Sequence, residues 1–331
     1  MNKLMTVVAA SVCAVSFSAV ALADADVSQE KLTEAEAEAV EEEEAKIFEA
    51  GVDFDFFSAY VWRNAIQTDE MVMQPCVWAD LTCFEPFWLG FYVWQNYDLT
   101  DRRHHDLERG LTETDYNVHI GVTAWESEDE EQSLGFELGH EWYDNHFVRS
   151  GSGNVYPDTR ELYIKVTYDN PFVNVYGQAS WLYEDFGDYK QGVHYELGLN
   201  KELDLAEVFE DLPEETLTLG ADWNVSFGTG NYLNYLFGGT RSGYDEEGEM
   251  RYDGSSAGFG GTTVKLYLTW QVCENFSIGG TVAYTGVLNA SYRESLGDQG
   301  DDWWDYSDET GGNGFYQRDF VWGGIQAKLS F

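Results

Sequence analysis

Acidic side chains recur at alternate positions in several segments of the chain. Asp53 and Asp55 are separated by Phe54, and Glu137 and Glu141 share one parity of the segment 133–146. In an extended strand, alternate side chains point to the same face, so these carboxylates would line one surface. An excess of carboxylates along a narrow aqueous path attracts cations and excludes anions. The spacing therefore predicts selection of a solute by charge.

The same alternation, applied to every strand-like segment, selects a polar face on which carboxylates outnumber basic side chains. Lys165 with Glu137, and Lys265 with Asp222, are expected to pair across strands. The ordinary structural explanation of such a face is that its charges pair and its aromatic residues pack against a loop folded inside. The candidates for lining a lumen are Asp53, Asp55, Arg63, Asp80, Trp88, Tyr92, Trp94, Asp115, Glu137, Glu141, Glu161, Lys165, Glu196, Asp222, Lys265 and Arg318.

Strands with one apolar face are the elements that must position these residues. The clearest examples alternate Tyr116, Val118 and Ile120, or Leu162 and Ile164, with polar residues. After residue 25 no run approaches the ~18 apolar residues of a membrane-spanning helix, so any crossing of a membrane must be made by strands. The expected strands begin near residue 47 and continue at 72–83, 86–97, 115–126, 133–146, 159–169, 172–184, 191–201, 215–228, 262–273, 275–290 and 316–331.

The connections between these strands alternate in length. Short turns such as CFEP, SEDEEQ, DNP and CEN follow every second strand, and most other connections are long. This asymmetry, with aromatic residues near the strand ends, is typical of an outer-membrane barrel. A soluble antiparallel barrel or sandwich would leave the asymmetry unexplained. We predict an all-β fold, a transmembrane antiparallel up-and-down barrel of about 12 strands whose first and last strands pair. The expected girdles are Tyr60, Trp62, Trp142, Trp181 and Trp223 at one end, and Tyr168, Trp270, Phe276 and Phe331 at the other.

The N-terminal part of the chain lacks the alternation of apolar and polar residues that marks the strands. Residues 1–25 have one basic residue, Lys3, then an apolar stretch and small residues suited to cleavage, which indicates a secretory signal peptide. A retained membrane anchor is the alternative. Residues 26–46 are rich in Ala and Glu and predict an acidic periplasmic extension, helical or disordered. Residues 47–331 would then form the barrel in the bacterial outer membrane, in contact with its lipid.

The charge of the chain restricts its partners. The sequence has 60 acidic and 18 basic residues, a formal net charge of −42. Such a surface repels the phosphates of nucleic acids, so a nucleic acid partner is not expected.

A resemblance to a known family rests on the segment SAYVWRNAIQTDE, residues 58–70. It resembles the first-strand element of a family of bacterial outer-membrane β-barrels of uncharacterised function, in which a Ser-x-Tyr-Val-x-Arg pattern is usually followed by Gly. Ser58, Tyr60, Val61 and Arg63 match this pattern, and Asn64 stands where Gly is usual. The C-terminal aromatic residue, Phe331, resembles the signal by which the barrel-assembly machinery recognises its substrates. The resemblance implies the fold and the location, and the assembly machinery as a partner.

Metal binding and catalysis have weaker support. The stretch DQGDDWWDYSDE supplies oxygen ligands for divalent cations, but it lacks the spacing of a calcium loop, and a solvated charged surface is the ordinary explanation. His140 could be imagined near Ser133 or Ser180, as in barrels that resemble lipases, yet no nucleophile-and-base spacing stands out. We therefore predict no enzyme and no cofactor. The loop carboxylates that could bridge divalent cations are Asp298, Asp301, Asp302 and Asp305.

Two functions are compatible with these observations. The first is a porin-like channel for small solutes with an acidic, cation-favouring lumen. The alternative is a structural or surface-binding barrel with a sealed lumen and acidic loops bridged by divalent cations. The inward carboxylates favour the channel as the prediction, and the two differ in whether loops block the lumen.

Overall fold

The computed structural model describes residues 48–68, 70–84, 86–99, 110–129, 131–146, 158–183, 191–209, 212–213, 216–237, 243–244, 250–251, 257–292 and 319–331. All of them belong to the unit Lys46–Phe331, one of two into which the chain divides. The predicted signal peptide and acidic extension lie outside the described residues, as do Arg318 and the four loop carboxylates at positions 298, 301, 302 and 305.

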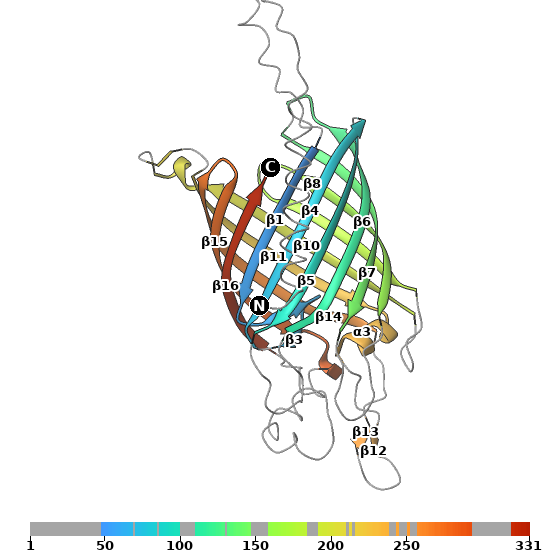
Figure 1. Ribbon diagram of the computed structural model, residues 1–331. Coiled ribbons are helices and arrows are strands. Elements are labelled where there is room, and N and C mark those ends of the chain that lie inside the picture. Colours follow the sequence, from blue (N-terminus) through green and yellow to red (C-terminus); the bar gives the residue numbers. More distant parts are fainter. Residues whose placement is uncertain are drawn as a thin grey trace, which may run out of the picture. The chain divides into compact units, whose positions relative to one another are not determined.

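Twelve of the described strands close into a single antiparallel barrel (Figure 1). β1 pairs with β16 through the register Gly51↔Ser330 to Phe57↔Gly324, which confirms the predicted pairing of the first and last strands. The barrel strands are β1 (Phe48–Phe57), β4 (Val72–Phe84), β5 (Phe87–Asp98), β6 (Gly110–Glu126), β7 (Ser133–Asn145), β8 (Thr159–Asp169), β9 (Asn174–Leu182), β10 (Gly192–Asp204), β11 (Leu217–Gly228), β14 (Gly258–Cys273), β15 (Phe276–Val287) and β16 (Asp319–Ser330).

Each barrel strand has an apolar outer face because its side chains alternate. Val118 and Ile120 on β6, and Leu138 on β7, are each at least half exposed. Exposed large apolar side chains in such continuous rows match a surface in contact with lipid. Among the expected girdle residues, Trp142 and Trp181 are exposed near one end, and Tyr168, Trp270 and Phe331 near the other, whereas Trp223 is exposed in the middle of β11. No helix among the described residues is long and apolar enough to cross a membrane.

The two ends of the barrel differ. The connections β4–β5, β6–β7, β8–β9, β10–β11 and β14–β15 lie at one end, which we call the turn end, and β10–β11 carries a 3-10 helix, η1 (Leu205–Glu207). The remaining connections lie at the loop end, where Figure 1 labels β3 and α3. They contain α3 (Gly230–Phe237), the small hairpin of β12 (Gly243–Tyr244) and β13 (Met250–Arg251), and the hairpin described next.

The first connection departs from the expectation. β1 ends at Phe57, and the chain forms a separate hairpin of β2 (Tyr60–Trp62) and β3 (Ala65–Thr68). Arg63 and Asn64 at its tip both have positive φ, which a two-residue type I′ turn requires and which Asn tolerates better than most residues. Tyr60 and Trp62, expected in the outer girdle, instead lie inside the barrel: Tyr60 is buried and Trp62 packs against Tyr143 of β7. The prediction for these two residues was wrong because β1 is shorter than the alternation suggested.

Candidate functional site

The strand residues predicted to line the lumen lie on the face opposite the exposed apolar side chains. Asp53 and Asp55 alternate with the exposed Phe54 and Phe56 on β1. The register places predicted residues of neighbouring strands side by side, as in Glu141↔Glu161 and Asp222↔Lys265. The same parity holds for Asp80, Trp88, Tyr92, Trp94, Asp115, Glu137, Lys165 and Glu196. Arg63 is the exception, since the hairpin and not a barrel strand carries it.

Arg63 joins the tip of the β2–β3 hairpin to three barrel strands. Its guanidinium forms a buried ion pair with Glu161 of β8 and donates to the Tyr143 hydroxyl of β7 at 3.2 Å. It also contacts Nδ1 of His194 on β10 at 2.8 Å. Tyr232 of α3 donates to the other oxygen of Glu161 at 2.9 Å. The Glu161 carboxylate, fully buried, is therefore held by a cation and two hydroxyl groups.

Asn64 anchors the same hairpin to a fourth strand of the barrel. Its amide nitrogen donates to the backbone oxygen of Gly261 on β14 at 3.3 Å, and the hydroxyl of Thr263 donates to its amide oxygen. In the strand order, β14, β10, β8 and β7 belong to one arc of the wall, which lies across the ring from β1 and β4, the strands that the hairpin connects. The hairpin tip therefore crosses the inside of the barrel from wall to wall.

Apolar side chains fill the space around this hairpin at the loop end. One cluster joins the hairpin and α3 to the inner wall, and each of its members is at most 2% exposed: Ala65, Leu182, Tyr232, Leu233, Leu236, Phe237, Val287 and Tyr292. A second cluster packs the base of the hairpin against β15 and β16, and consists of Ala59, Ala283 and Trp322 with Phe57, Val61 and Phe320. Together the two clusters form an apolar plug inside the barrel.

Buried carboxylates lie next to this plug. Asp115 and Glu141 are less than a tenth exposed, and Tyr92 donates a hydrogen bond to Glu141. Glu113, two residues before Asp115 on the same face of β6, is equally buried. The sequence reasoning missed Glu113 because it began this strand at residue 115, whereas β6 begins at Gly110. The alternation itself would have found it.

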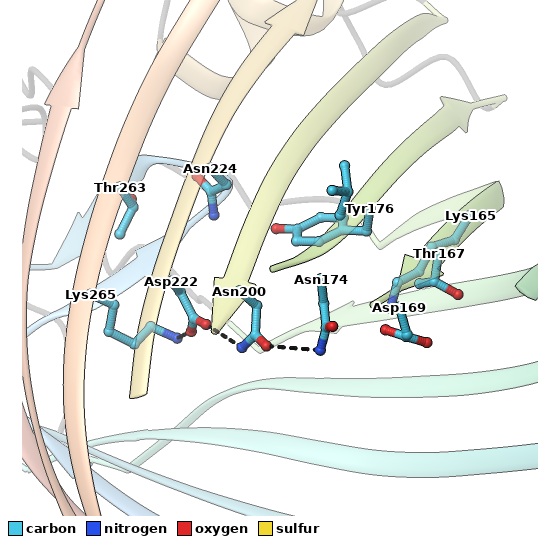
Figure 2. Close-up of a pocket in the computed structure, with 11 residues that line it drawn as sticks. Lys165, Thr167, Asp169, Asn174, Tyr176, Asn200, Asp222, Asn224, Thr263 and Lys265 are labelled. Atoms are coloured by element: carbon cyan, nitrogen blue, oxygen red, sulfur yellow. Dashed lines mark hydrogen bonds and ion pairs between the residues drawn. The ribbon is translucent and has the colours of Figure 1, made fainter. Parts of the chain in front are cut away.

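A polar cavity of about 410 Å³ opens in the turn-end half of the barrel, on strands β8, β9, β10, β11 and β14 (Figure 2). Figure 2 shows a row of hydrogen-bonded side chains along its wall. Asn174 donates to Asn200 at 3.5 Å, Asn200 donates to Asp222 at 2.6 Å, and Lys265 pairs with Asp222 at 3.3 Å. The cavity is lined by Lys165, Thr167, Asp169, Asn174, Val175, Tyr176, Asn200, Asp222, Asn224, Thr263 and Lys265.

The cavity contains three predicted residues, Lys165, Asp222 and Lys265, and several that were missed. The asparagines and threonines were missed because the search of the inward face selected charged and aromatic side chains. Their parity on the strands is the signal that could have identified them. Amides and hydroxyls form hydrogen bonds without a net charge, so a count of charged residues does not detect them.

The two expected ion pairs have different outcomes. Lys265 pairs with Asp222 as expected. Glu137 lies opposite Lys165 in the register but accepts a hydrogen bond from Tyr163 at 2.7 Å, and the Lys165 ammonium lies 5.7 Å from the centre of the Tyr176 ring. Gly139 lies opposite Tyr163 and leaves room for its phenol ring to reach Glu137. No ion pair of Lys165 is present within the described residues.

The residues considered for catalysis contact other groups. The ring of His140 contacts the Tyr183 hydroxyl at 2.8 Å on the outer surface. Ser180 is buried on the opposite face and accepts from Gln178, and Ser133 donates to Asp169 at the turn end. In the part of the chain that the structure describes, no group of three or more His, Cys, Asp or Glu side chains is arranged to hold a metal ion.

Two solved barrels similar to this chain illustrate its structural neighbours. The outer membrane phospholipase A from Escherichia coli is 10% identical, with 85% of this chain and 92% of that chain covered and a TM-score of 0.42. The translocator domain of the autotransporter NalP from Neisseria meningitidis is 9% identical, with 90% and 92% covered and a TM-score of 0.41. No curated protein sequence matches the chain.

A family model matches the sequence directly. The model of the MltA-interacting protein MipA matches residues 89–295, more than half of the chain, from within β5 to beyond β15. The Ser-x-Tyr-Val-x-Arg element and Phe331, on which the sequence resemblance rested, lie outside the matched residues. The chain belongs to the MltA-interacting protein MipA family.

Proposed function

We propose that this protein is an outer-membrane barrel with a sealed lumen, which serves as a binding scaffold through its turn end. The observation that carries this proposal is the hairpin held across the barrel by Arg63 and Asn64, with apolar side chains packed around it. A conducting path needs continuous water, and buried apolar clusters at the loop end oppose it. The sealed barrel was the alternative prediction from the sequence, and the geometry favours it over an open channel.

The hairpin is held tightly enough to act as a stable closure. Separating a buried ion pair leaves an uncompensated charge in a poorly solvated site, which costs roughly 3–5 kcal/mol. Glu161 is fully buried and Arg63 nearly so. The apolar clusters add to this cost because the hairpin and α3 would have to expose them to water.

The turn end is the surface that we assign to binding a partner. In outer-membrane barrels the short turns face the periplasm, and the chain termini lie on that side. The family is named for an interaction with MltA, and we extend to this chain a protein partner that docks at the periplasmic turns. Export through a cleaved signal peptide, and recognition of Phe331 by the barrel-assembly machinery, complete this proposal.

A gated, cation-favouring channel is the second candidate. It is favoured by the buried carboxylates Glu113, Asp115 and Glu141 beside the plug, which would face a water path if the hairpin moved out. In this proposal the hairpin is a gate rather than a permanent seal.

Recordings of the full-length protein in a planar bilayer distinguish the two candidates. The sealed barrel should give no conductance steps. The double variant Arg63→Ala/Asn64→Ala removes both anchors of the hairpin, and it should give intermittent steps with a cation-favouring reversal potential. Lys328→Gln, which removes a lumen cation on β16 away from the hairpin, is the matched control and should stay silent.

Steady, cation-selective conductance of the wild-type protein would reject the sealed barrel and support the channel. If the double variant is as silent as the wild type, the seal belongs to α3 and its cluster rather than to the hairpin. Folding of each variant is checked by the faster gel migration of the unboiled barrel.

A further inference from the structure

The cavity at the turn-end half of the barrel is charge-balanced, although the chain as a whole is strongly acidic. Two lysines, Lys165 and Lys265, and two aspartates, Asp169 and Asp222, line it, whereas the full sequence has a net charge of −42. A site built for cations would be expected to keep an excess of carboxylates, and a site for anions an excess of lysines. The balance of this lining matches a ligand without net charge.

The remaining polar groups of the lining suit hydroxyl groups. The amides of Asn174, Asn200 and Asn224 each carry donors and an acceptor, and Thr167 and Thr263 add hydroxyls. A sugar hydroxyl both donates and accepts, so it can use both halves of such amides. Figure 2 shows the Asn174, Asn200 and Asp222 side chains side by side along the wall, as a ligand with hydroxyls at neighbouring positions would need.

One acceptor in this lining is unused. The amide oxygen of Asn224 is buried and has no hydrogen-bond partner among the described residues. More than nine in ten buried polar atoms in proteins have a partner, so Asn224 is a lining residue whose hydrogen bonding the described residues leave incomplete. Asn224 and Asp222 are on the same face of β11, which places the Asn224 side chain next to the hydrogen-bonded row.

We propose that this cavity binds a neutral sugar of one or two rings, which enters from the turn end. The volume of about 410 Å³ is near the lower end of the ~300–1,000 Å³ typical of small-molecule sites, which limits the ligand to this size. The inference rests on the proposed function in one respect: the plug at the loop end makes the cavity a dead end, so the sugar is bound and not passed on.

Binding can be measured on the full-length protein by saturation-transfer NMR and calorimetry, in a detergent without a sugar head group. The probes are a panel of neutral sugars, namely glucose, N-acetylglucosamine and maltose, together with the cation glucosamine and the anion glucuronate. We expect at least one neutral sugar to bind and both charged sugars to bind more weakly. Asn224→Leu and Asn200→Leu should each weaken binding about tenfold, the effect of losing one or two hydrogen bonds.

Gln326→Leu is the matched control, because it removes an amide from the inner face of β16 outside the cavity and should leave the affinity unchanged. The proposal is overturned if the panel of neutral sugars shows no binding, if a charged sugar binds best, or if Asn224→Leu and Gln326→Leu behave alike. Bilayer recordings separate this result from the proposed function. If the protein binds a sugar and also conducts steadily, the sealed lumen is rejected and the sugar site is kept. If the protein does not conduct and binds no sugar, the sugar site alone is rejected.

Discussion

The contact with Arg63 determines which ring nitrogen of His194 carries the proton. A guanidinium only donates hydrogen bonds, so Nδ1 of His194 must accept from Arg63 and the ring proton lies on Nε2. This Nε2 is buried and has no partner among the described residues. Arg63 thus contacts His194, Tyr143 and Glu161 at once, and its loss would leave Nδ1 of His194 without this donor and the buried Glu161 carboxylate without its counter-charge.

Arg63→Ala should lower the free energy of unfolding by roughly 3–5 kcal/mol, because it leaves the buried Glu161 carboxylate uncompensated. Urea unfolding in detergent, followed by tryptophan fluorescence, measures this change. The double variant Arg63→Met/Glu161→Leu should lose less unfolding free energy than the sum of the losses of Arg63→Met and Glu161→Leu, since both charges are removed together. Additive losses would show that the two side chains do not stabilise each other.

Within the strands, inward glycines make room for aromatic rings from the neighbouring strand. Gly220 of β11 lies opposite Tyr267 of β14, and a Cβ at Gly220 would overlap the Tyr267 ring. Tyr267 donates to Glu202 at 2.7 Å and accepts from Asn200 at 3.3 Å, next to the cavity. The packing of rings over glycines therefore fixes the position of side chains that line the candidate site.

Gly220→Val should destabilise the barrel by about 1–3 kcal/mol, because the Tyr267 ring must move and its hydrogen bonds are strained. Gly280→Val on the outer face of β15 is the matched control, since a Cβ there would meet no heavy atom closer than 3.9 Å. The two variants are compared by urea unfolding. Equal losses would mean that backbone effects, rather than the Tyr267 contact, explain the result.

Across the whole molecule, the barrel closes where the end of the chain meets its first strand. The backbone nitrogen of Phe331 donates to the oxygen of Ala50 at 2.8 Å, and the nitrogen of Ala50 donates to the oxygen of Phe331 at 3.3 Å. The side chain of Phe331 is 54% exposed and contributes little to packing. The backbone therefore completes the seam, and the exposed ring is the group that we propose as the assembly signal.

Phe331→Ala should change the stability of the folded barrel by no more than about 0.5 kcal/mol, as for other exposed positions. It should clearly reduce the amount of heat-modifiable barrel in the outer membrane, because it removes the proposed signal for the assembly machinery. Phe172→Ala, in the exposed β8–β9 turn, is the control and should assemble normally. Normal assembly of Phe331→Ala would refute the role of the terminal ring as a signal.

The sequence alone determined the barrel. Alternation with a period of two is a local property, so it identified the strands, their outer faces and the pairing of β1 with β16. It also placed Asp222 beside Lys265, because neighbouring strands share a simple register.

The tertiary structure decided what fills the barrel. Arg63 and Glu161 are 98 residues apart in the sequence, and no local pattern shows that the hairpin between β1 and β4 folds inward to meet β8. The polar cavity was equally hidden, because its asparagines come from β9, β10 and β11 and carry no charge. Contacts between distant strands exist only once the sheet has closed, which is the physical reason that the lumen could not be predicted from the sequence.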